Sequence, residues 1–466
     1  IVTTKKGSSG KTKISVSAYT GVQSAQHLIN MADNAQYVNA YNIAASNDGR
    51  PKISSTLAAT LSNTNWLKAV LKPAQVTNAS LSIGGGNENS QYIVAANFFS
   101  QNGLIKNSSF NRFNIRTSLN STLSSYFKIG TNLNLSYAKT RAVGTSGDGF
   151  SGAAASVVRY ALFRTPGTPV YNAKGQFVDL PTQDPLLGNF LGDGINPAAE
   201  ADAANNNTYR YSVLGDAYIE IDPIKGLKIK SDLGGNLILA NNKTFFKTYG
   251  IDRFFNSPNS LSQTQSTELN YNWTNTATYD LTLGKHVINL LAGTELIKQN
   301  LQAQSESRTG YVNQNPSFQY LDNGTSASQQ NGGNENHFAL SSVFASAHYQ
   351  YAGKYLASAS YRRDGSSQLD PSARYQGFAS GALGWRIDQE EFMKNVTPIS
   401  TLKLRASVGQ LGNEQSIGNY PYVSLLSGGF YYPFGGGSTQ GYSITSKGNP
   451  NVRWESSTQQ DAGLDI

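Results

Sequence analysis

Regular alternation of apolar and polar side chains, over stretches of ten or more residues, constrains this chain more than any other feature. Between residues 126 and 137 one parity is apolar and the other polar, with Phe127, Ile129, Leu133, Leu135 and Tyr137 against Lys128, Asn132, Asn134 and Ser136. Residues 211–222 show the same division. Successive side chains of a β-strand point to opposite faces, so each such strand has one apolar and one wet face. The alternation therefore predicts the strands of a sheet that has one apolar face and one polar face.

The connections between these stretches are alternately short and long. Asp222-Pro223 with Gly226, and Gly284, are turn residues that join neighbouring strands closely, whereas residues 142–207 form a long insertion. Roughly fourteen strands follow one another with a tight turn at every second connection. A β-sandwich or a propeller would not have its long loops on one side only. We therefore predict an all-β fold, an antiparallel transmembrane β-barrel with long extracellular loops.

Composition narrows the remaining classes. No run approaches the 18 or so apolar residues that a membrane-spanning helix requires, so the sequence excludes a helical membrane protein. The 466 residues include no cysteine, which excludes a disulfide framework and a thiolate metal site. The net charge is +8, but Lys and Arg are spread along the chain without a basic run of five, so nucleic-acid binding is not predicted.

A few segments depart from the strand pattern. We expect helical structure over residues 26–45, a short helix over 153–163 that ends before Pro166, and a helical turn over 389–395. A long polar loop is expected to follow the strand that ends at residue 299 and to continue to Glu335.

Motifs along the whole chain occur in a recognisable order. They are Ile1-Val2-Thr3-Thr4-Lys5-Lys6-Gly7, Tyr361-Arg362-Arg363-Asp364-Gly365-Ser366-Ser367, Arg374-Tyr375, Gly384-Trp385-Arg386, Leu402-Lys403-Leu404-Arg405-Ala406-Ser407 and Trp454-Glu455. In these motifs the chain resembles the SusC/RagA-like TonB-dependent transporters of Bacteroidota outer membranes.

The resemblance implies an architecture and a function. Residues 1–10 would be the end of a plug domain and a linker, and residues 11–466 would be an incomplete part of a larger receptor barrel of about 22 strands. The implied function is TonB-dependent import of oligosaccharides or oligopeptides across the cell outer membrane. The implied partners are a SusD-like surface lipoprotein that covers the pore, outer-membrane lipid, and TonB, which would act through a missing N-terminal part. No cofactor is implied.

The sequence offers little for catalysis or metal binding. Gly10-Lys11-Thr12 lacks the glycine five positions earlier that a phosphate loop needs, because Lys5 is there. No Gly-x-Ser-x-Gly nucleophile elbow follows a strand, and we predict no enzyme. The four histidines lie far apart in the sequence and do not predict a zinc site: His27, His286, His337 and His348.

One aromatic cluster is a candidate substrate-binding site. Phe430, Tyr431, Tyr432 and Phe434 lie between glycines in a long outward loop. Aromatic faces stack on sugar rings or pack against peptides, and flanking glycines let a loop adapt. A self-packed loop cluster or a contact with a partner lid is the alternative. For Arg362, Arg363 and Asp364 we favour a hydrogen-bonded turn over an anion site.

Two other functions remain open at this stage. A passive porin would share the barrel but not the energy coupling, and the plug-like residues 3–7 favour the transporter. A surface adhesin or structural β-protein would be soluble without detergent. A siderophore receptor is also possible, although nothing in the sequence is suited to chelating iron.

Overall fold

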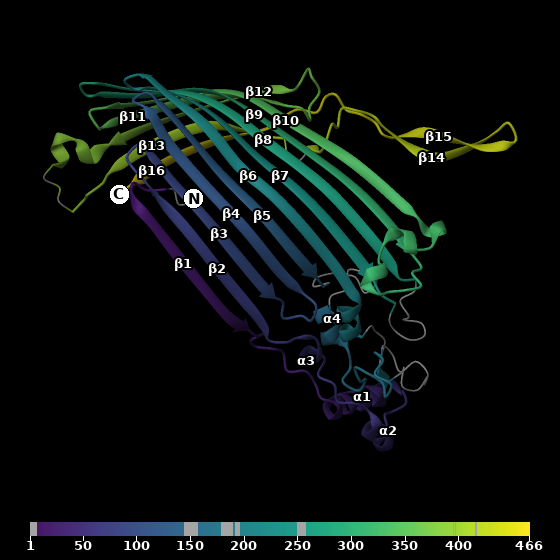
Figure 1. Cartoon of the computed structure of the whole chain (residues 1–466). Coiled ribbons are helices and arrows are strands. Elements are labelled where there is room, and N and C mark those ends of the chain that lie inside the picture. Colours follow the sequence, from purple (N-terminus) through teal and green to yellow (C-terminus); the bar gives the residue numbers. More distant parts are fainter. Residues whose placement is uncertain are drawn as a thin grey trace.

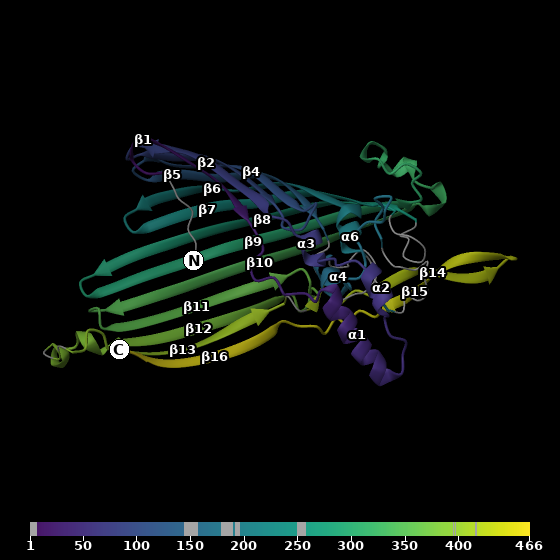
Figure 2. The same cartoon turned by 90° about the horizontal axis from the view of Figure 1, so that it is seen from below.

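A computed structural model describes residues 7–143, 157–178, 190–191, 196–248, 258–394, 396, 398–414 and 417–466. Its main feature is one 14-stranded antiparallel sheet (Figures 1 and 2). The strands are β1 (Gly10–Gln23), β2 (Ala74–Gly86), β3 (Ser90–Asn102), β4 (Ser109–Ser124), β5 (Phe127–Ala142), β6 (Ala204–Ile224), β7 (Leu227–Phe246), β8 (Ser260–Leu283), β9 (His286–Thr309), β10 (Gln330–Tyr351), β11 (Tyr355–Ser366), β12 (Tyr375–Arg386), β13 (Lys403–Asn413) and β16 (Glu455–Asp465). Each strand pairs with the next in this order, which confirms the predicted all-β antiparallel barrel wall.

Tight and long connections alternate along this wall. The turns β4–β5, β6–β7, β8–β9 and β10–β11 are short, and β1 begins and β16 ends at the same rim (Figure 1). The longest connections, β1–β2, β5–β6 and β13–β16, leave from the opposite rim, which the sequence predicts to be the extracellular one, whereas the β12–β13 connection, residues 387–402, is a longer one at the rim of the tight turns. We call the two rims the tight-turn rim and the long-loop rim.

The pairing register keeps the predicted polarity across the wall. Directly opposite residues of antiparallel strands share a face. Asn132 lies opposite Asp216, and Asp216 lies opposite Gly234, which continues the polar face of β5. On the other face, Leu135 lies opposite Val213. We call the polar face the lumen face, because in a barrel the apolar face contacts lipid.

The longest strands extend well beyond the alternating pattern. β8 and β9 have 24 residues each, about 80 Å along the strand, whereas the hydrocarbon core is about 30 Å thick. The predicted polar loop over residues 300–335 is therefore wrong at both ends, because β9 continues to Thr309 and β10 begins at Gln330, and only residues 310–329 lie between the strands. Side chains are polar on both faces here, so the pattern is lost while the backbone pairing continues.

Helices of two long connections form a compact unit at the long-loop rim, which we call the loop cap. The β1–β2 connection contributes α1 (Asn34–Asp48), α2 (Ser55–Thr60) and α3 (Trp66–Val70), and the β5–β6 connection contributes α4 (Val157–Phe163) and α6 (Pro197–Ala203). None of the helices in the described ranges is long and apolar enough to cross a membrane.

The helix predictions are only partly confirmed. α1 begins at Asn34, not at residue 26, because Asp33 and Gln36 form a capping box there, with Gln36 N donating to Asp33 Oδ1 at 2.8 Å. α4 begins at Val157, and residues 153–156 lie outside the described ranges. Over residues 389–395 the expected turn is present as two 3₁₀ turns, Ile387–Gln389 and Glu391–Met393.

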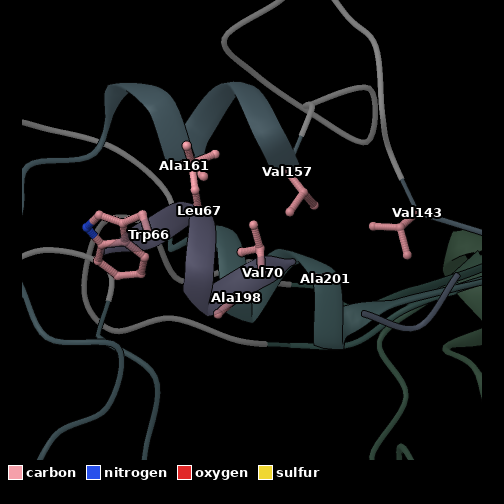
Figure 3. Close-up of a cluster of buried hydrophobic side chains, with 8 residues drawn as sticks. All are labelled: Trp66, Leu67, Val70, Val143, Val157, Ala161, Ala198 and Ala201. Carbon is pink, nitrogen blue, oxygen red and sulfur yellow. The ribbon is translucent and has the colours of Figure 1, made fainter. Parts of the chain in front are cut away.

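The loop cap has its own hydrophobic core (Figure 3). Its buried members are Trp66, Leu67 and Val70 of α3, Val143 directly after β5, Val157 and Ala161 of α4, and Ala198 and Ala201 of α6. Trp66 is the largest, is 1% exposed, and donates from Nε1 to the Thr165 carbonyl at 2.9 Å. The two connections, distant in the sequence, are therefore joined into one folded unit.

Candidate functional site

A groove of about 620 Å³ lies on the lumen face near the long-loop rim, and we call it the mouth groove. Its floor comes from three adjacent strands. Glu268 of β8 lies opposite Leu301 of β9, and Leu301 lies opposite Asn336 of β10, so the three side chains share a face. The remaining strand residues on this face are Asn270, Ile297, Gln299, Phe338 and Leu340, and His337 also lines the groove. The volume is in the range of small-molecule sites.

Two loops complete the mouth groove from the other side. Gln368 comes from the β11–β12 connection, and Glu414 and Asn419 come from the segment after β13. Gln368 Nε2 donates to Asn419 Oδ1 at 3.0 Å, and Asn419 Nδ2 donates to Asn336 Oδ1 at 3.2 Å. These bonds fasten both loops to β10, so the groove is a built feature of the wall.

Closer to the tight-turn rim, charged side chains of the lumen face pair with one another. Lys128 Nζ lies 3.0 Å from Glu220 Oε1 and 2.7 Å from Asp222 Oδ2. Lys230 Nζ lies 2.5 Å from Asp232 Oδ2. The polar parity of the sequence predicted Lys128, Glu220 and Asp222 on the wet face, and the register places the opposite charges of this face together.

Arg362 is the centre of a second charged group on the same face. It donates from Nη2 to Glu295 Oε2 at 2.5 Å and to Ser342 Oγ at 2.7 Å, and from Nε to Asp364 Oδ1 at 2.6 Å. These bonds agree with the predicted structural role. The predicted turn is wrong, because Arg362, Arg363 and Asp364 all lie within β11. Arg363 points to the opposite face and its guanidinium lies 4.9 Å from the centre of the Tyr375 ring.

The four aromatic candidates do not line the mouth groove. Phe430, Tyr431, Tyr432 and Phe434 lie on β14 (Leu425–Phe434), which pairs with β15 (Gly437–Ser446) in a separate hairpin that extends away from the sheet (Figures 1 and 2). All four are exposed.

The sequence predicted an irregular loop where this hairpin lies. Gly435 and Gly436 have φ of 61° and 82°, which suits the two-residue turn that favours hairpins. Gly441 lies opposite Phe430, and a Cβ at Gly441 would collide with the Tyr432 ring. The glycines thus specify a hairpin with aromatic side chains on its surface.

The four histidines are distributed over β9, β10 and the segment after β1. His337 alone of the four lines the mouth groove, and His286 shares a hydrogen bond of 2.8 Å between Nδ1 and the Tyr349 hydroxyl near the tight-turn rim. Within the described ranges, no three His, Asp or Glu side chains are arranged to hold a metal ion.

At the tight-turn rim, Glu390 joins three side chains from two strands and a turn. Its carboxylate accepts hydrogen bonds from Lys354 Nζ at 2.8 Å, the Tyr355 hydroxyl at 2.8 Å and Trp385 Nε1 at 3.1 Å. These donors, with Lys354 the strongest, lower the pKa of Glu390 to about 2. Glu390 therefore fastens the β12–β13 connection to the rim.

Replacing this carboxylate should change stability in a pH-dependent way. The folded-state pKa is depressed, so its contribution is complete above the ordinary value of 4.5 and disappears as pH falls toward 2. In the full-length protein at pH 7, Glu390→Gln should lower the temperature at which heating changes the migration of the barrel in a gel. This difference from the unsubstituted protein should disappear as the pH falls from 4.5 to 2. Glu391→Gln is the control, because the Glu391 carboxylate is exposed and pairs with the exposed Lys394. Equal effects of the two substitutions would contradict the assignment.

Comparison with known proteins agrees with this architecture. No family model matches the chain. It is 29% identical to TonB-dependent receptor P3 of Formosa agariphila over 481 residues, which are 100% of this chain and 44% of that protein. It is 26% identical to TonB-dependent receptor SusC of Bacteroides thetaiotaomicron, covering 100% of this chain and 46% of SusC. The chain thus spans about half the length of the curated relatives it matches.

Solved structures show the same fold. A structure of the RagAB peptide transporter superposes with a TM-score of 0.79 at 21% identity, covering 99% of this chain and 54% of that one. The wall thus has the fold of that transporter's barrel wall. The chain is related to the SusC/RagA-like TonB-dependent receptors, which confirms the resemblance seen in its motifs. Its location is the cell outer membrane, and the proteins it matches are named as receptors and transporters.

Proposed function

We propose that the chain forms part of the barrel wall of a TonB-dependent importer of oligosaccharides or oligopeptides. In this proposal residues 1–10 end the plug and residues 11–466 belong to the barrel. A SusD-like surface lipoprotein covers the pore, and TonB acts through the plug side of the full-length protein. The observation that carries the proposal is the mouth groove, a site of small-molecule size on the lumen face that is lined by polar and apolar side chains. The names of the RagAB peptide transporter and of SusC support it.

The β14–β15 hairpin is proposed to make the first contact with the substrate. Phe430, Tyr431, Tyr432 and Phe434 expose ring faces that can stack on sugar rings or pack against apolar side chains of a peptide. The hairpin lies in the connection between β13 and β16, as do the groove residues Glu414 and Asn419. The hairpin and the segment that borders the groove therefore belong to the same connection of the chain.

An uptake experiment tests the proposal. A strain lacking the full-length receptor would be complemented with the unsubstituted gene or with a variant carrying serine at the four aromatic positions. A tryptic digest of casein and a mixed oligosaccharide hydrolysate would be supplied with and without a protonophore. Uptake should require the receptor and the proton gradient, and the variant should raise KM about tenfold at an unchanged maximal rate.

Two results would contradict parts of the proposal. Receptor-dependent uptake that persists with the protonophore would indicate a passive channel of the porin type. An unchanged KM in the serine variant, with its heat-modifiable migration intact, would remove the hairpin from substrate binding and leave contact with the lipoprotein as its role.

A further inference from the structure

The mouth groove has an uneven charge. Its lining includes two carboxylates, Glu268 and Glu414, and no Lys or Arg. Asn270 Nδ2 donates to Glu268 Oε1 at 2.6 Å, which orients this carboxylate without neutralising it. In the part of the chain that the structure describes, neither Glu268 nor Glu414 has an ion-pair partner.

Carboxylates elsewhere on the lumen face are placed differently. Glu220 lies against Lys128 at 3.0 Å, and Glu295 lies against Arg362 at 2.5 Å. Elsewhere on the wall a Lys or Arg side chain thus lies beside these carboxylates, whereas the lining of the groove contains no Lys or Arg. The remaining polar groups of the groove are the His337 imidazole and five amides, from Asn270, Gln299, Asn336, Gln368 and Asn419, beside apolar side chains that include Phe338.

From this lining we infer that the mouth groove selects neutral or cationic oligomers rich in hydrogen-bond donors and rejects anionic ones. Amide and carboxylate oxygens accept hydrogen bonds from hydroxyl or amide groups of an oligomer. An anionic group placed in the groove would meet two like charges whose repulsion is only partly screened by water. This inference rests on the proposed importing function and adds a charge preference to it.

Binding to the purified full-length receptor tests the preference. The probes are a tryptic casein digest and an oligosaccharide hydrolysate containing neutral and uronate oligomers, with retained species identified by mass spectrometry. The receptor should retain acidic members of each set about tenfold less than neutral ones. Glu268→Gln and Glu414→Gln together should abolish that depletion. The amide of Gln at position 268 can still accept the Asn270 bond, so the wall should remain folded.

Glu306→Gln is the control for the loss of a carboxylate as such, because it removes one negative charge from β9 on the face away from the groove. Glu306 lies opposite Gln263 and Asn331, whereas the groove residue Leu301 lies opposite Glu268 and Asn336. This control should keep the depletion of acidic probes. Retention that ignores probe charge, an unchanged preference in the double variant, or retention of nothing from either set would overturn the inference. Uptake of the same digests by the unsubstituted strain remains a separate measure of the importing function.

Discussion

Trp66→Ala is expected to open the loop cap while leaving the barrel wall intact. The side chain is 1% exposed at the centre of the cap core, and removing a buried tryptophan costs about 3–5 kcal/mol. Local opening of the cap should therefore become at least about a hundredfold more frequent. Limited proteolysis of the full-length protein in detergent would show faster cleavage within residues 24–73, while heat-modifiable migration of the barrel should be preserved.

Trp66→Phe serves as the control for this prediction. Phenylalanine keeps a large ring in the core and loses the bond from Nε1 to the Thr165 carbonyl, which should cost about 1 kcal/mol. Its cleavage rate should lie between those of the unsubstituted protein and the alanine variant. Equal cleavage of all three proteins would show that the cap does not depend on this core.

Arg362→Met is expected to destabilise the barrel wall. The substitution leaves the carboxylates of Glu295 and Asp364, which are 23% and 12% exposed, without their shared cation. Breaking a fully buried pair costs about 3–5 kcal/mol, and partial exposure reduces this to about 2 kcal/mol. The full-length barrel should change its gel migration at a lower temperature in detergent.

Arg363→Met is the neighbouring control. Arg363 is exposed on the opposite face of β11, where it contacts the Tyr375 ring, so its loss should change stability by about 0.5 kcal/mol or less. Adding Glu295→Gln to Arg362→Met should restore part of the lost stability, because one uncompensated carboxylate is removed. No recovery in this double variant would mean that Arg362 acts through packing over Phe344, 5.2 Å from its guanidinium.

The faces of the strands could be predicted from the sequence, but their ends could not. Lys128 and Asn132 were placed on the wet face from parity, and the register confirms it. The alternation of apolar and polar residues stops where both faces of a strand meet water, as toward Thr309 of β9. The alternation arises because one face contacts lipid, and it does not depend on the hydrogen bonds between strands. A strand whose two faces both meet water needs no apolar residues, so its sequence carries no alternating pattern from which its end could be predicted.

The candidate site was predictable to a lesser degree. Glu268 and Asn270 lie within a predicted strand on its polar face, so parity could have indicated them. Gln368 and Asn419 could not have been found in this way, because their contact joins residues 51 positions apart in loops. The aromatic cluster drew attention by composition, yet its pairing with β15 places it on a hairpin outside the groove.

The strand order of the sheet has a consequence for how this surface can change. β13 and β16 are immediate neighbours, with Asn413 directly opposite Glu455, although the β14–β15 hairpin lies between them in the sequence. The register of the wall therefore does not depend on the length or content of this intervening segment. Insertions, deletions or replacement by an unrelated sequence could alter what the cell surface presents while the membrane-embedded part keeps its shape.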